Sequence, residues 1–222
     1  MRELAKKALM RTVGFAALVG ILVIVPAGPA YWRGWLFWIV FSLSSLFMMI
    51  YFLQHDPALV ERRLHARGEK EPSQQIIRLI LSVVLIPLFV LPGLGHRFGF
   101  AQLPASIAVV ADAVVVLGFA IIFLTFRANS HAAAIIDVAP DQPVVSTGPY
   151  AMVRHPMYLG ATLLLLATPF ALGSAWAIIF AVMAVCALVW RLLEEERYLS
   201  QHLPGYDDYR QVTRYRLVPL VW

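Results

Sequence analysis

His155 to Trp190, HPMYLGATLLLLATPFALGSAWAIIFAVMAVCALVW, is an uncharged run of 36 residues. One membrane-spanning helix needs about 20 residues, so this run is too long for a single span. Gly173 and Ser174 interrupt it near its middle, where glycine favours a turn. The run therefore predicts two helices, from about Met157 to Leu172 and from about Ser174 to Glu196, that fold back on each other as a hairpin.

The rest of the chain predicts four full spans. About 60% of the 222 residues are apolar and only 14% are charged, whereas ordinary soluble domains are about 45 to 50% apolar and about 25% charged. This composition excludes an aqueous globule, a disordered chain and a disulfide scaffold. Asp112 is the one charge within the predicted spans, and we expect it to reach an interface. The spans are Thr12–Trp32, Gly34–His55, Leu79–His96 and Ser106–Phe126.

Charge placement predicts the orientation of this all-α integral membrane protein. If the N-terminus is cytoplasmic, 16 of the 18 Lys and Arg residues lie in cytoplasmic segments, and only Arg33 and Arg97 lie outside. This is the positive-inside distribution, and it requires the C-terminal hairpin to return to the cytoplasmic side. We expect a bacterial inner-membrane protein with both termini and the active site cytoplasmic. The net charge of +5 suits anionic lipid headgroups and requires no nucleic-acid partner.

Two regions are expected. Residues 1–126 form a transmembrane scaffold, with an interfacial helix at about 56–68 that starts at the cap Asp56-Pro57. Residues 127–222 form a cytoplasmic cofactor-binding loop, the helical hairpin and a charged, Tyr-rich tail. The loop from Phe126 to Met157 is about 30 residues long, and loops of that length are usually functional or disordered.

Polar chemistry gathers where the hairpin begins and ends. Pro156 suits the first turn of a helix, whose free N–H groups attract a carboxylate or phosphate. His155 and Tyr158 flank this end with side-chain donors, while Arg191 and Glu195, four residues apart, project from one helical face. A ligand with both a carboxylate and an ammonium group, such as an amino-acid moiety, matches this arrangement.

No metal site or disulfide is expected. Cys186 is the only cysteine, so thiolate clusters and intramolecular disulfides are excluded. The remaining histidines have no shared spacing for a metal or haem; they are His55, His65, His96, His131 and His202.

These residues resemble a known family. GPYAMVRHPMYLG (148–160), Glu195-Glu196 with Leu199, and GYDDYRQ (205–211) are similar to motifs of the isoprenylcysteine carboxyl methyltransferase and phospholipid methyltransferase superfamily of integral membrane proteins. The resemblance extends from about Asp56 to Pro219 and is sharpest from Thr147 to Tyr209.

The resemblance implies S-adenosylmethionine as methyl donor and no metal. The family's substrate-carboxylate arginine falls on Arg191, which would orient the acceptor. A glutamine that such enzymes can place before the loop is not evident here, where Ala134 or Ile135 stands near that position. The donor contacts fall by position on Gln142, Pro143, Val144, Val145, Tyr150, His155, Pro156, Met157, Tyr158 and Glu195.

The acceptor stays open among lipophilic molecules. The absence of a dedicated base favours a carboxylate of an isoprenylcysteine-like molecule, because a phospholipid amine or a small thiol would first have to lose a proton. One rival is a membrane reductase with a nicotinamide cofactor. Another is a non-catalytic transporter or accessory subunit, whose polar residues should lie at mid-bilayer. The oligomeric state cannot be read from the sequence.

Overall fold

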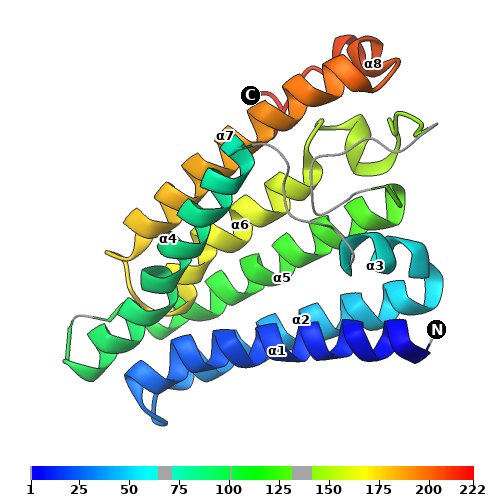
Figure 1. Ribbon diagram of the computed structural model, residues 1–222. Helices are drawn as coiled ribbons and strands as arrows, with labels where there is room; N and C mark the ends of the chain where they lie inside the picture. The colour runs from blue at the N-terminus through cyan, green and yellow to red at the C-terminus, as the bar shows by residue number, and fades with distance from the viewer. Residues whose placement is uncertain (1, 65–71, 101, 132–141) are drawn as a thin grey trace.

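The computed structural model describes residues 2–64, 72–100, 102–131 and 142–222, and every regular element in these ranges is a helix (Figure 1). Four helices are long and apolar enough to span a membrane, namely α1, α2, α4 and α5. The all-helical class and the four spans followed by a hairpin are thereby confirmed. The elements are α1 (Arg2–Ala27), α2 (Trp32–His55), α3 (Pro57–Leu64), α4 (Pro72–Arg97), α5 (Ala105–Ala128), the 3-10 helix η1 (Gly148–Ala151), α6 (Pro156–Ala171), α7 (Ile178–His202) and α8 (Tyr206–Val212).

Local sequence signals explain several boundaries. Gly173 has a φ of 72°, a conformation that glycine adopts without steric cost, and it ends α6 where the hairpin was predicted to turn. The Asp56 carboxylate accepts a hydrogen bond of 3.0 Å from the Leu59 N–H, which caps α3 as expected. Leu59 and Val60 are buried against the bundle. The predicted interfacial helix is therefore helical over 57–64, and its expected residues 65–68 lie outside the described ranges.

The two ends of the helical bundle carry different segments of the chain. The site end carries α3, the segment 142–158 and α8, and the turn end carries the connections after α1, α4 and α6 (Figure 1). At the turn end the three connections are tied together. The Tyr31 hydroxyl donates to the Leu172 carbonyl, the Leu103 N–H donates to the Gly173 carbonyl over 3.0 Å, and Arg33 donates to Gln102 over 3.0 Å. The hairpin is thus fixed at the end where it turns.

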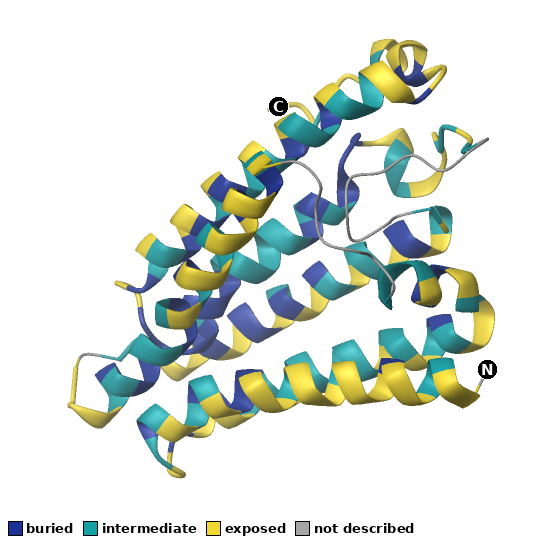
Figure 2. Cartoon of the chain, in the orientation of Figure 1, coloured by how far each residue is buried: buried dark blue, intermediate teal, exposed yellow. Residues whose placement is uncertain are grey.

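The hairpin packs tightly on the fourth span. A Cβ at Gly160 of α6 would lie 2.7 Å from the Gly118 carbonyl of α5, and a Cβ at Gly118 would lie 2.8 Å from the Gly160 carbonyl. The two glycines therefore allow the backbones of α5 and α6 to touch, as small residues do between membrane helices. The outer faces of α1 and α2 are largely exposed (Figure 2), as expected for surfaces that meet lipid.

The expectation for Asp112 is wrong. Its side chain does not reach an interface: the residue is only 4% exposed, and neither carboxylate oxygen has a hydrogen-bond partner among the described residues. The reason is its helical phase. Asp112 shares one face of α5 with Ala108 and Val115, and that face packs inside the bundle.

Candidate functional site

The start of α6 and the end of α7 meet at the site end. The Tyr158 hydroxyl donates a hydrogen bond of 2.5 Å to the Glu195 carboxylate, although the two residues are 37 positions apart. The Arg191 guanidinium lies one turn before Glu195. It interacts with the Tyr158 hydroxyl through its charge and through a side-chain hydrogen bond. The hairpin was predicted to bring the polar residues at its start close to those at its end. The structure places Tyr158 beside Arg191 and Glu195 in this way.

Among the described residues, the first turn of α6 has backbone N–H groups without a hydrogen-bond acceptor. Pro156 occupies the first helical position, and His155 precedes it without a side-chain cap hydrogen bond. The N–H groups of Met157 and Tyr158 belong to the first helical turn, which has no intrahelical acceptor for them. They lie at the positive end of the helix dipole, where a carboxylate is favoured.

Arg191 is held from a third helix. Its Nη1 donates a hydrogen bond of 3.0 Å to Oε1 of Gln74, which lies in the first turn of α4 and is 2% exposed. Gln74 was not singled out from the sequence, because no local pattern relates residues 117 positions apart. The contact fixes the direction in which the guanidinium points.

The predicted loop residues lie beside the tail. Val144 and Tyr150 pack against a cluster of Leu203, Tyr206 and Tyr209. The Tyr209 hydroxyl donates to the Tyr150 carbonyl over 2.7 Å, which ties α8 to η1. In the same segment Pro143 is exposed, and Gln142 and Val145 are partly buried. Ala134 and Ile135, near which the family's glutamine was sought, lie outside the described residues.

A buried ionic cluster surrounds Glu196. Its carboxylate lies 2.7 Å from Arg154 Nη2, 2.6 Å from Arg216 Nε and 3.9 Å from His155 Nε2. Glu196 is 4% exposed and Arg154 is 8% exposed. The sequence did not predict this cluster, and Glu196 entered the sequence analysis only as part of the Glu195-Glu196 motif. Consecutive helical residues point about 100° apart, so Glu195 reaches Tyr158 while Glu196 reaches the tail.

Burial sets the protonation states at this end. The pKa of His155 is lowered to about 4, mainly because burial disfavours the charged imidazolium. Glu196 opposes this shift, and the Arg154 and Arg216 charges add to it. Burial also raises the pKa of Tyr150. At neutral pH the site therefore offers a neutral imidazole and a protonated phenol.

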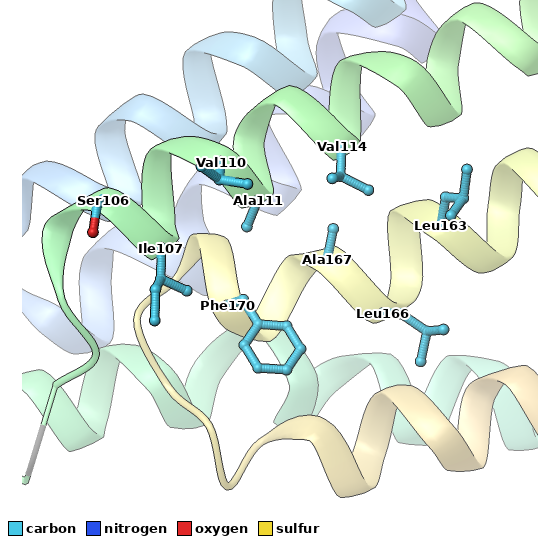
Figure 3. Close-up of a pocket in the computed structure, with 9 residues that line it drawn as sticks. All are labelled: Ser106, Ile107, Val110, Ala111, Val114, Leu163, Leu166, Ala167 and Phe170. Carbon is cyan, nitrogen blue, oxygen red and sulfur yellow. The ribbon is translucent and has the colours of Figure 1, made fainter.

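An apolar groove lies farther along the hairpin (Figure 3). It has a volume of about 450 Å³ and runs between α5 and α6. Its nearest lining residue on α6, Leu163, is seven residues from Pro156, or about 10 Å along the helix. Its lining residues are Ser106, Ile107, Val110, Ala111, Val114, Leu163, Leu166, Ala167 and Phe170.

Comparisons with known proteins agree with this fold. The solved structure of a eukaryotic intramembrane Ras methyltransferase, isoprenylcysteine carboxyl methyltransferase, superposes with a TM-score of 0.55. The two chains are 19% identical, and the match covers 96% of this chain and 77% of that chain. At this identity the likeness shows a shared fold. No curated protein matches the sequence.

A family model described as phospholipid methyltransferase matches residues 107–204. This region includes all of α6 and α7 and most of α5, and every residue of the predicted site falls inside it. The matched region of the family model and the shared fold thus both include the hairpin and the segment before it.

Proposed function

We propose that this protein transfers a methyl group from S-adenosylmethionine to a lipophilic acceptor. The observation that carries the proposal is the hydrogen bond between Tyr158 and Glu195. It closes the hairpin so that a carboxylate, a guanidinium and the first turn of α6 share one end of the bundle. The family match over residues 107–204 supports a methyl-transfer reaction at this site.

The donor fits the chemistry of these groups. S-adenosylmethionine carries an amino-acid end and supplies a methyl group already activated on a sulfonium sulfur. The Glu195 carboxylate would accept its ammonium group, and the free N–H groups of Met157 and Tyr158 would receive its carboxylate. His155 Nε2 is buried and has no hydrogen-bond partner in the described part of the chain. A polar atom of S-adenosylmethionine would supply that partner.

The nucleoside end of the donor would meet the loop. Val144 and Tyr150 offer apolar and aromatic surface beside the tail cluster, and Gln142, Pro143 and Val145 continue the same segment. The tail residues Tyr206 and Tyr209 are packing residues here, because both rings are buried in the tail cluster.

Arg191 would orient the acceptor. A guanidinium forms paired hydrogen bonds with a carboxylate, and Gln74 holds the Arg191 side chain in place. A carboxylate acceptor is already ionised at neutral pH, so the chain need only align it about 3 to 3.5 Å from the methyl carbon and exclude water. We therefore propose the carboxylate of an isoprenylcysteine-like molecule as the acceptor. A phospholipid amine or a small thiol would need a residue that takes up its proton.

The site end faces the cytoplasm of a bacterial inner membrane in this proposal. Arg154, Arg210 and Arg216 all lie at this end, as the positive-inside rule requires of a cytoplasmic face. Residues 1–126 then act as scaffold, and residues 127–222 contain the donor site. The acceptor would enter from the bilayer and the donor from the cytoplasm.

The decisive experiment is to identify a labelled product. Purified protein is incubated with S-adenosylmethionine labelled in its methyl group and with a membrane extract that contains lipids and thiols. We expect label in a lipophilic product, whose base lability separates a methyl ester from a methylated amine or thioether. Donor binding without any labelled product in such extracts would contradict the proposed activity.

Two variants test the assigned roles. Glu195→Ala should weaken donor binding about tenfold or more, because it removes a charged hydrogen-bond acceptor. Arg191→Ala should leave donor binding intact and reduce acceptor turnover. Glu194→Ala is the matched control, since Glu194 pairs at the surface with Arg197. Unchanged donor affinity in all three variants would contradict the assignment, and tight binding of a nicotinamide cofactor instead would favour a reductase.

A further inference from the structure

The C-terminal tail lies along the segment that precedes α6. The Arg154 N–H donates to the Tyr215 carbonyl and the His155 N–H donates to the Arg216 carbonyl, both over 2.9 Å. The Arg154 guanidinium adds contacts of 3.3 Å to the carbonyls of Thr213 and Arg214. The backbone before Pro156 is thus covered by residues 213–216.

Glu196 sits where this segment, the tail and α7 meet. Arg154 comes from the segment before α6, Arg216 comes from the tail, and their side chains both reach the same carboxylate, at 2.7 and 2.6 Å. A third cation, Arg210 of α8, lies 4.0 Å away. One carboxylate therefore joins three parts of the chain that are far apart in sequence.

We propose that Glu196 is a positioning residue that latches residues 213–217 onto Arg154 and His155, and so holds the donor site in its binding geometry. The inference rests on the proposed function for its last step only, because the latch itself is a property of the folded chain. Glu196 acts through its partners: its neighbour Glu195 points to Tyr158, and Glu196 points to the tail.

Electrostatics explains why the latch depends on this carboxylate. Arg154 is almost fully buried, and a buried guanidinium without a counter-charge is strongly unfavourable. If Glu196 were neutral, Arg154 and Arg216 would repel each other at close range. The tail would then keep its two backbone hydrogen bonds, the Arg154 contacts to the Thr213 and Arg214 carbonyls and the packing of Leu217. Without the ion pairs, however, its local opening would cost less free energy.

Release of the tail would disturb the donor contacts directly. The His155 N–H bonds to the tail backbone, and His155 begins the turn that presents the Met157 and Tyr158 N–H groups. The Leu217 side chain is 5% exposed and packs against Tyr158 and Leu192. A free tail would therefore leave His155 and Tyr158 less well ordered.

Amide hydrogen exchange on the full chain in detergent, without donor or acceptor, tests the latch. Glu196→Gln should accelerate exchange at residues 213–217 about tenfold or more, while the amides of α5 serve as an internal reference for global opening. Glu194→Gln should leave the tail unchanged. Unaltered exchange at 213–217 in Glu196→Gln would overturn the proposal.

A second variant keeps the test informative if Glu196→Gln folds poorly. Arg216→Gln leaves Arg154 paired with Glu196 and removes only the tail's link, so it should loosen residues 213–217 to a similar degree. The double variant Glu196→Gln with Arg216→Gln should loosen the tail no more than Glu196→Gln alone, because both changes break one contact. Fully additive effects would contradict a shared latch.

Donor binding tests the positioning step. Glu196→Gln should raise the dissociation constant for S-adenosylmethionine about tenfold, and Glu196→Asp should restore part of the affinity by returning the charge. A loosened tail with unchanged donor affinity would overturn the positioning role. If the wild-type protein bound no donor at all, the proposed function would fail while the exchange data still decided the latch.

Discussion

The Tyr158 hydroxyl and the Glu195 carboxylate form a 2.5 Å hydrogen bond between α6 and α7. This contact makes the two halves of the hairpin one site, since Tyr158 lies in the first turn of α6 and Glu195 lies near the end of α7. The contact helps to orient the carboxylate that we assign to the donor's ammonium group.

Tyr158→Phe tests this contact. The variant removes one hydroxyl and keeps the ring, so the packing against Leu192 and Leu217 should persist. We expect donor affinity to fall about three- to tenfold, since a hydrogen bond contributes about 1 kcal/mol. Isothermal titration calorimetry with S-adenosylmethionine measures this affinity. Tyr198→Phe is the control, because the Tyr198 ring stacks on His202, and equal losses in both variants would contradict a specific role for Tyr158.

The contact of Gly118 with Gly160 predicts a second effect. Gly160→Ala places a Cβ 2.7 Å from the Gly118 carbonyl, and a backbone atom can give way only if α5 and α6 separate. We expect the free energy of unfolding to fall by about 1 to 3 kcal/mol, with weaker donor binding because α6 carries the site. Gly14→Ala, where no atom lies within 4 Å of the added Cβ, should show no loss in the same thermal and chemical unfolding assays.

The juxtaposition of the hairpin ends could be predicted from sequence. An uncharged run of 36 residues with Gly173-Ser174 near its centre can only cross the membrane region and return, so its two ends must lie at the same depth. The Asp56 cap, the four spans and the turn at Gly173 followed from local signals in the same way. These features depend on residues close together in the chain.

The partners of Glu196 and of Arg191 could not be predicted. They depend on which face α7 turns toward its neighbours and on the path of the tail, and both are decided by packing between distant segments. Asp112 shows the same limit, because a hydropathy run does not reveal which side of a span faces the bundle. Gln74 reaches Arg191 only because α4 packs beside α7.

Gln74→Ala tests how Arg191 is positioned. Loss of the Gln74 amide leaves the guanidinium without its 3.0 Å acceptor on α4. We expect kcat/KM for the acceptor to fall about tenfold, as for loss of a hydrogen bond to a charged group, while donor affinity stays unchanged. Gln74→Glu keeps an acceptor at the same place and should retain most of the activity. Equal donor and acceptor defects in Gln74→Ala would indicate a general loss of structure instead.

His155 predicts how stability depends on pH. Its pKa is about 4 in the folded chain against an ordinary value of 6.5, mainly because of burial. Below pH 6.5 the unfolded chain binds a proton that the folded chain does not, so the free energy of unfolding falls as the pH drops from about 6.5 to 4 and is independent of this group above 6.5. The slope contributed by His155 approaches about 1.4 kcal/mol per pH unit. Chemical unfolding in detergent at a series of pH values measures it: His155→Asn should lose this slope, and His202→Asn, at the exposed end of α7, should keep it. A wild-type slope retained in His155→Asn would show that another group controls the acid sensitivity, because a side chain that no longer titrates cannot take up the proton on unfolding.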